Sequence, residues 1–188
     1  MDADRFLANH FLIAVPAMHD PNFSRAVTLL CQHNDEGAMG VMINRVSSYR
    51  LGDILGQMDI TSDDQELLAT PVLAGGPVQP ERGFVLHDPT EREWDSSFQV
   101  SPQLSLTTSR DILVAMAAGE GPPRALVALG YAGWGAGQLE AELQENTWLA
   151  ASADPAILFE TPIEQRWAAA ARLIGIDLSL LTNYAGHA

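Results

Sequence analysis

Apolar residues along this chain fall in short runs that are separated by turn-forming residues. Alternating or β-branched runs predict strands at 10–15, 26–33, 39–43, 71–74, 83–87, 125–130 and 156–159. Helical spacing predicts helices at 51–58, 62–69, 108–119, 137–145 and 161–175. The two kinds of segment alternate irregularly, without a repeat or a regular βαβ series. The pattern therefore predicts an α+β fold with a mixed sheet and about five helices, in a single domain spanning 1–188.

The helix at 161–175 has the most complete set of end signals. Thr161 is the expected N-cap, Pro162 lies in the first turn, Glu164 completes a capping box and Gly175 ends the helix. Between two predicted strands, residues 91–103 are polar enough to form an excursion or a lid.

The charge of the chain excludes several chemistries. The formal net charge is −14, and all ten basic residues are arginines. Without a lysine there is no Schiff base and no phosphate-binding lysine of the Walker type. The arginines are scattered singly, so the negative field opposes direct nucleic-acid binding.

Cys31 is the single cysteine, which agrees with a reducing compartment. No apolar run reaches the length of a membrane-spanning helix, and the first residues lack the basic region of a secretory signal. We expect a cytoplasmic protein without a membrane segment.

The strand predicted at 26–33 ends in residues that are candidates for catalysis or ligand binding. Regular alternation puts Val27, Leu29, Cys31 and His33 on one face. Cys31 then follows two core residues, which favours packing over the alternative of a nucleophile or redox sensor. His33 lies where the strand surfaces, so it is either a ligand or acid-base group or a structural hydrogen-bonding residue.

Further polar candidates lie at the ends of neighbouring strands. Asn34 begins an Asn-Asp-Glu-Gly stretch that predicts a turn between two strands. Asn44 ends the second of these strands and either bonds the backbone across the sheet or contacts a ligand. His87 closes a later strand and is the best partner for His33 if the two strand ends converge.

Two glycine-rich loops suggest binding. Gly75 and Gly76 precede a proline that lacks the N–H an anion site needs, so a tight turn is favoured over a phosphate loop. The second loop, 130–137, leads from a strand into a helix. It is a candidate binding surface formed by Trp134, Gly137, Gln138 and Glu140, although the acidic first turn of the helix repels phosphate. Trp134 is either a packing anchor or an exposed contact residue.

No metal site and no cofactor are expected. The histidines (His10, His19, His33, His87 and His187) are far apart in sequence and show no metal-ligand spacing. No serine lies in a nucleophile elbow.

Several long stretches together resemble the AlgH/YqgE family of bacterial proteins. They are 10–44, 71–87, 106–113, 125–143, 146–149 and the tail from 157, in the same order over nearly the whole chain. The resemblance implies bifurcated sheets around a small barrel-like core with helices outside, and a regulator of transcription. The family commonly has glutamate after the cysteine, where this chain has Gln32, which argues against a role that needs a carboxylate there.

The resemblance brings no catalytic assignment. We therefore expect a non-enzymatic regulatory protein that acts through contacts with a protein partner or a small ligand rather than through direct DNA binding. The alternative is an enzyme of unknown class with a pocket near His33, Asn34 and His87.

Overall fold

The computed structural model describes residues 6–177, which form ten strands, six α-helices and one 3-10 turn. The strands are β1 (His10–Ala14), β2 (Val27–Asn34), β3 (Gly37–Met42), β4 (Val46–Arg50), β5 (Pro71–Ala74), β6 (Val78–His87), β7 (Ser97–Ser101), β8 (Leu104–Thr107), β9 (Ala125–Gly135) and β10 (Trp148–Ser152). The helices are α1 (Leu51–Gln57), α2 (Gln65–Ala69), α3 (Arg110–Ala117), α4 (Gln138–Gln144), α5 (Pro155–Phe159), the 3-10 turn η2 (Ile163–Gln165) and α6 (Arg166–Arg172).

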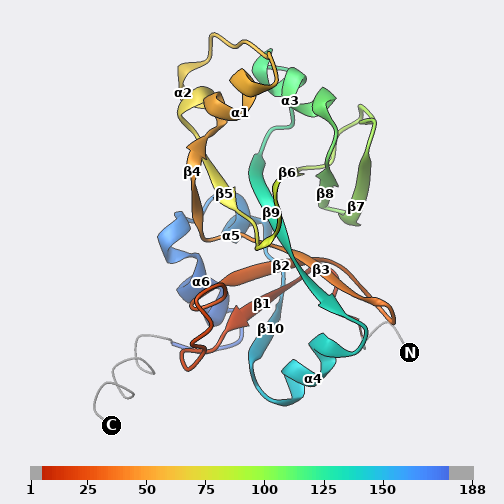
Figure 1. Ribbon diagram of the computed structural model, residues 1–188, viewed down its shortest axis with the longest axis vertical. Helices are drawn as coiled ribbons and strands as arrows, with labels where there is room; N and C mark the ends of the chain where they lie inside the picture. Colours follow the sequence, from red (N-terminus) through yellow and green to blue (C-terminus); the bar gives the residue numbers. More distant parts are fainter. Residues whose placement is uncertain (1–5, 178–188) are drawn as a thin grey trace.

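One curled sheet carries the fold, and the long strand β9 belongs to both of its halves. The strand order is β10-β1-β2-β3-β9-β6-β8-β7, with β4 and β5 attached beside β9. The second half of β9 pairs with β3, whereas its first half pairs with β6 and, in parallel, with β5. The sheet therefore splits at β9 into a lower half and an upper half (Figure 1). This confirms the predicted α+β fold with a bifurcated sheet.

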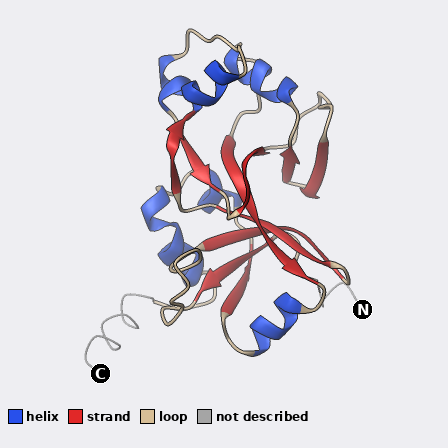
Figure 2. Cartoon of the chain, viewed as in Figure 1, coloured by secondary structure: helices blue, strands red, loops and turns tan. Residues whose placement is uncertain are grey.

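Helices cover the outer faces of both halves (Figure 2). On the lower half, α4 lies over a buried cluster that includes Leu12, Leu30 and Trp134. On the upper half, α1 and α3 enclose a second cluster around Leu55, Val85 and Ile112. The main core joins the two halves and packs against α5 and α6.

The Gly75-Gly76 pair lies where the chain crosses β9. The N–H of Gly75 donates to Leu129 at 2.7 Å, so it is occupied by the fold. Gly76 has φ +156, and a Cβ there would lie 2.1 Å from the carbonyl carbon of Tyr131. The pair permits a close backbone crossing where β9 passes from one half of the sheet to the other. Gly75 and Gly76 thus lie in an irregular segment between β5 and β6 rather than in a regular hydrogen-bonded turn.

Two segments have a different secondary structure from the prediction. Residues 156–159, predicted as a strand, form α5, because the Asp154 side chain accepts from the N–H of Ala156 at 2.9 Å and Pro155 occupies the first turn. Residues 97–101, predicted as part of a polar excursion, form the edge strand β7. Strands β4, β8 and β10 were not predicted.

The helix predicted at 161–175 begins later and less regularly. Its start is the 3-10 turn η2, with Pro162 as N-cap, and α6 follows. Thr161 is not the cap, because its hydroxyl donates to the carbonyl of Ala156 at 3.3 Å. The other predicted helices are present within a few residues of their expected ends.

Between residues 6 and 177, no helix has both the length and the apolar character needed to cross a bilayer.

Candidate functional site

A β-bulge in β2 turns His33 to the opposite face from Cys31. The register pairs Leu30 with Gly40 and Gln32 with Met39, leaving Cys31 as the extra residue. Beyond a bulge the alternation of side chains is inverted. His33 therefore shares a face with Leu30 and α4, which corrects the prediction that it lies beside Cys31.

Both ring nitrogens of His33 are bonded within the fold. The N–H of Leu7 donates to Nδ1 at 2.9 Å, and Nε2 lies 2.7 Å from a carboxylate oxygen of Glu140. Since Nδ1 accepts, Nε2 carries the proton and donates to Glu140. The His33 side chain is 0% exposed, and Phe6 packs edge-on against it at 5.2 Å. This geometry ties the N-terminal segment and α4 to β2 and favours the structural reading of His33.

Cys31 is a core residue. It is 3% exposed and belongs to the main hydrophobic core. Burial raises the pKa of its thiol to about 12, so the reactive thiolate is not populated near neutral pH. These observations favour packing over the redox role.

The side chains of α4 hold an aromatic cluster. Glu142 accepts the indole N–H of Trp134 at 3.2 Å and that of Trp148 at 2.9 Å. Gln138 donates to the same carboxylate at 2.9 Å and accepts the N–H of Gly135 at 2.9 Å. Trp134 is 6% exposed, which favours the packing anchor over the exposed contact residue.

The residues of the predicted binding loop therefore mainly contact other parts of the fold. These residues are Trp134, Gly137, Gln138 and Glu140. Gly137 starts α4 with φ +75. Glu140 and Gln138 bond neighbouring elements rather than pointing into a hollow.

Asn34 and Asn44 bond the backbone. The Asn34 side chain accepts the N–H of Glu36 at 2.8 Å, which closes the two-residue turn of the β2-β3 hairpin. Asn44 accepts the N–H of Val27 at 2.9 Å and donates to the carbonyl of Arg25 at 2.8 Å. Asn44 thus bridges two segments of backbone, which was one of its two predicted roles.

His87 lies at the end of a chain of hydrogen bonds in the upper half. Its Nδ1 is 2.7 Å from the carbonyl of Asp88, and its Nε2 is 2.7 Å from the Thr107 hydroxyl. A carbonyl only accepts, so Nδ1 carries a proton. The Thr107 hydroxyl in turn donates to the hydroxyl oxygen of Ser97 at 2.9 Å. His87 is 1% exposed, and burial lowers the pKa of its imidazole.

The stability of the protein should therefore depend on pH through His87. The unfolded chain protonates this histidine near its ordinary pKa of about 6.5, whereas the folded chain protonates it at lower pH. The stability that neutral His87 contributes is full above pH 6.5 and declines as the pH falls toward the folded pKa. We expect His87→Asn to cost about 1–3 kcal/mol at pH 8 and less at pH 5.5, measured by urea unfolding. An equal cost at both pH values would contradict this assignment.

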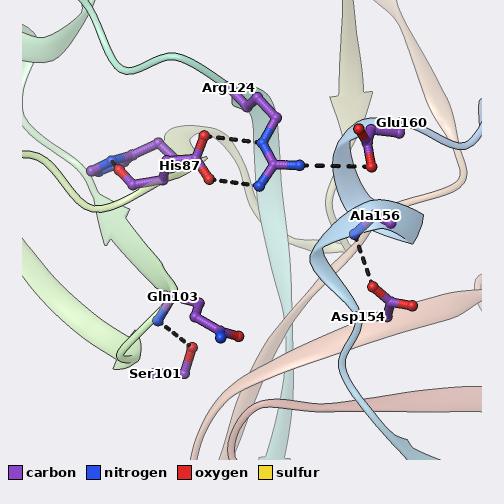
Figure 3. A network of polar contacts seen from close by, with 8 residues as sticks. His87, Ser101, Gln103, Arg124, Asp154, Ala156 and Glu160 are labelled. Carbon is purple, nitrogen blue, oxygen red and sulfur yellow. Dashed lines mark hydrogen bonds and ion pairs between the residues drawn. The ribbon is translucent and has the colours of Figure 1, made fainter.

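A salt bridge next to His87 connects the upper half to α5. Arg124 donates two hydrogen bonds to the carboxylate of Asp88, both at 3.0 Å, and lies 3.8 Å from Glu160 (Figure 3). Its guanidinium also stacks on Phe159 at 5.0 Å. The hydrogen bonds to Asp88 raise the pKa of Arg124.

The structure does not bring His33 and His87 together. His33 pairs through Ala38 with Trp134, near the end of β9, whereas His87 pairs with Ala125 at its start. Nine residues of strand separate these positions, roughly 30 Å at about 3.3 Å a residue. The predicted pocket formed by His33, Asn34 and His87 is wrong, because the two strands end at opposite ends of β9.

An open groove lies between the lower and the upper half of the sheet. It has a volume of about 660 Å³ and runs between the β2-β3 hairpin and the strands β6, β7 and β8. Its apolar walls include Met39, Phe84, Phe98 and Tyr131. Phe84 and Tyr131 meet edge to face at 5.8 Å.

Arg82 supplies the charge of the groove. It is the one charged residue in the groove lining, and its guanidinium lies 5.4 Å from the ring centre of Phe84. Within residues 6–177 Arg82 forms no ion pair. A second hollow beside the hairpin turn, lined by Asn34 and Gly37, shares Gln32, Ala38, Met39 and Trp134 with the groove. Among the predicted candidates, Trp134 therefore lines the groove and Asn34 lines the adjoining hollow.

The sequence contained a signal for this groove that the prediction missed. If the strand at 83–87 is extended back by one residue, the side chains of Arg82 and Phe84 point to the same face. Residues 97–101 show a polar-apolar alternation that is typical of an edge strand. Arg82 was placed in the loop that precedes the strand predicted at 83–87, and residues 97–101 were placed in the polar excursion at 91–103, because of the proline, glycine and charged residues nearby.

No group of three or more histidine, cysteine or carboxylate side chains in residues 6–177 is placed to hold a metal ion. His187 lies outside the described residues.

Comparisons with known proteins agree with the architecture. The family model of AlgH-like proteins matches residues 11–179. A UPF0301 protein of Xanthomonas campestris pv. campestris is 62% identical over 182 residues, covering 97% of this chain and 96% of the relative. A UPF0301 protein of Xanthomonas oryzae pv. oryzae is also 62% identical over the same length.

Two solved structures have a similar fold. The solution structure of the AlgH protein from Pseudomonas aeruginosa aligns with a TM-score of 0.80 at 50% identity, covering 94% of this chain and 93% of that one. A crystal structure of a protein from Corynebacterium diphtheriae aligns with a TM-score of 0.74, covering 93% of this chain and 90% of that one, and at 18% identity it supports the fold alone.

The molecule is thus an α+β protein built on a split, curled sheet with an open groove between its two halves. The chain belongs to the AlgH-like family.

Proposed function

We propose that this chain is a non-enzymatic cytoplasmic regulatory protein that acts by binding an extended segment of a protein partner in the groove between the two halves of its sheet. The observation that carries the proposal is the groove itself, whose apolar and aromatic walls surround a single stacked arginine. Exposed apolar hollows with a few placed polar groups are typical of recognition sites.

The shape and the edge of the groove favour a protein segment over a small ligand. The groove is open along the sheet rather than enclosed, and β7, which contributes Phe98 to its wall, is the last strand in the sheet order. Within the described residues the outer edge of β7 therefore has unpaired backbone groups, which an extended peptide can bond. Side chains of that peptide would then pack against Phe84, Phe98 and Tyr131.

Arg82 implies a carboxylate in the partner. A guanidinium that lies on an aromatic ring still presents its N–H groups at the edge, in the geometry that a carboxylate accepts. The partner segment we propose therefore combines apolar residues with an aspartate or glutamate. The net charge of −14 opposes a polyanion, so direct DNA contact is not part of the proposal.

The candidate acid-base residues are all occupied within the fold, which favours binding over catalysis. His33 and His87 each have both ring nitrogens bonded within the fold, and burial suppresses the Cys31 thiolate. None of these three residues lines the groove.

Affinity capture from cell extract tests the proposal with matched charge reversals. Arg82→Glu changes the groove, whereas Arg172→Glu makes the same change at an exposed position at the end of α6. We expect a partner that is recovered equally with the wild type and Arg172→Glu, and about ten-fold less with Arg82→Glu. Equal recovery with all three proteins, or none above an unrelated acidic protein, would refute the proposal.

A further inference from the structure

The outer edge of β7 presents the backbone groups of two particular residues. The N–H of Thr108 donates to the carbonyl of Ser96 at 2.9 Å, so the backbone of Ser96 faces the neighbouring strand β8. In an antiparallel pair, the backbone groups of successive residues point alternately toward the partner strand and away from it. Phe98 therefore also bonds toward β8, whereas the N–H and C=O groups of Ser97 and Gln99 point outward. β7 is the outermost strand of the upper half in Figure 1.

The two faces of the β7-β8 pair border different hollows. Leu106 lines only the groove, whereas Gln99 and Ser105 line only a second hollow of about 450 Å³. Phe98 borders both, since it lies on the edge strand between them. This arrangement follows from the alternation of side chains along paired strands, because Phe98 pairs with Leu106 and Gln99 pairs with Ser105. A strand added to β7 would therefore place successive side chains in the groove and in the second hollow by turns.

The buried part of the second hollow is fixed by contacts within the fold. His87 and Trp94 are 1% and 8% exposed, and their rings meet edge to face at 6.5 Å. Arg92 stacks on the indole of Trp94 at 4.4 Å. Arg92 and Glu93 are the charged residues of the lining, so a charged side chain of either sign would meet a like charge. The hollow therefore favours neutral side chains.

The exposed polar groups of the second hollow can both donate and accept hydrogen bonds. In the part of the chain that the structure describes, the Gln99 amide and the Ser105 hydroxyl form no side-chain hydrogen bond. The Ser97 hydroxyl accepts from Thr107, which leaves its own proton to donate. Serine, threonine and asparagine side chains match such groups, because each also donates and accepts.

We propose that the partner segment adds to β7 as a further strand and is recognised on both faces. Residues at every second position are apolar or acidic and enter the groove, and the residues between them are small, neutral and polar and enter the second hollow. The strand bonds the outward backbone groups of Ser97 and Gln99. The register of β7 shifts between Gln99 and Ser101, which ends the regular edge, so the recognised stretch is about five residues long. This inference rests on the function proposed for the groove and adds the sequence pattern of the partner.

Selection of peptides tests the pattern without knowledge of the natural partner. A displayed library of randomised dodecapeptides is selected on the full chain and, in parallel, on Arg82→Glu. We expect peptides that prefer the wild type to repeat with a period of two, with serine, threonine or asparagine between apolar and acidic residues. Enrichment without this period would overturn recognition on both faces and leave the groove proposal standing. If no peptide prefers the wild type over Arg82→Glu, the groove proposal fails as well.

Variants of β7 and β8 then test the two contacts with one selected peptide, by fluorescence anisotropy. Gln99→Pro removes the outward N–H at an edge position where proline is tolerated, whereas Gln99→Ala keeps it. Ser105→Trp fills the second hollow, whereas Ser105→Ala leaves it open. We expect Gln99→Pro and Ser105→Trp each to bind about ten-fold more weakly than the matching alanine variant. Equal binding within each pair, while Arg82→Glu still weakens binding, would refute this inference and not the groove proposal.

Hydrogen exchange of the wild type gives the same test without a substitution that could impair folding. The outward N–H groups of Ser97 and Gln99 should exchange at least about ten-fold more slowly when the peptide is bound. The N–H of Phe98, which points toward β8, serves as the internal control and should change less. Unchanged exchange at Ser97 and Gln99 in the saturated complex would show that the segment does not extend the sheet.

Discussion

Gly76→Ala is expected to lose more than about 4 kcal/mol of stability, a large part of the 5–15 kcal/mol typical of a domain. A Cβ on Gly76 would lie 2.1 Å from the carbonyl carbon and 2.2 Å from the carbonyl oxygen of Tyr131. These are backbone atoms of β9, so no side-chain rotation relieves the overlap. At φ +156 an alanine also adopts a strained backbone.

The crossing of the chain over β9 would have to open, and β9 joins both halves of the sheet. We therefore expect Gly76→Ala to be largely insoluble or to unfold at low urea, as measured by circular dichroism.

Gly56→Ala provides the matched control. Gly56 lies inside α1, and a Cβ there meets no atom within 4 Å. Because alanine is the better helix former, this variant should gain about 1 kcal/mol. A Gly76→Ala protein with wild-type stability would show that the crossing is not closely packed.

Trp148→Ala is expected to cost about 3–5 kcal/mol, the range for truncating a buried aromatic residue. Trp148 is 2% exposed and lies edge to face with Phe23 at 5.5 Å and with Trp134 at 6.1 Å. Its indole N–H donates to Glu142 on α4. Truncation thus removes the centre of the cluster that holds α4 against the lower half of the sheet.

Trp148→Phe distinguishes the contribution of the apolar ring from that of the indole N–H. Phenylalanine keeps most of the apolar contact, and Glu142 retains hydrogen bonds from Trp134 and Gln138. We expect this variant to cost about 1 kcal/mol. Urea unfolding followed by circular dichroism measures both variants. If Trp148→Ala cost no more than Trp148→Phe, the cluster would not be holding α4, and the loop would again be a candidate binding surface.

The strands that could be predicted are those with continuous apolar runs. β1, β2 and β5 are buried, and burial makes their sequences uniformly apolar or alternating. β4 and β7 were missed because edge strands are exposed and carry serine, arginine and glutamine. The helix α5 was missed because its apolar residues are too few to show a period, although Asp154 and Pro155 mark its start.

Single residues were harder to predict, since their roles depend on contacts distant in sequence. The bulge at Cys31 exchanges the faces of Gln32 and His33, and nothing in an apolar run specifies where an extra residue is inserted. The bonds of His33 to Leu7 and Glu140 join segments 26 and 107 residues away. The packing role of Cys31, in contrast, could be predicted from its apolar neighbours in the sequence alone.

Photo-crosslinking from the groove tests the central claim most directly. A benzoylphenylalanine at position 98, in the groove wall, and one at position 114, an exposed position on α3 that is 40% accessible, are compared in living cells. We predict one discrete protein adduct from position 98, lost when Arg82→Glu is added, and none from position 114. Equal adducts from both positions, or none from position 98 in the folded protein, would contradict the proposal that this groove binds a protein partner.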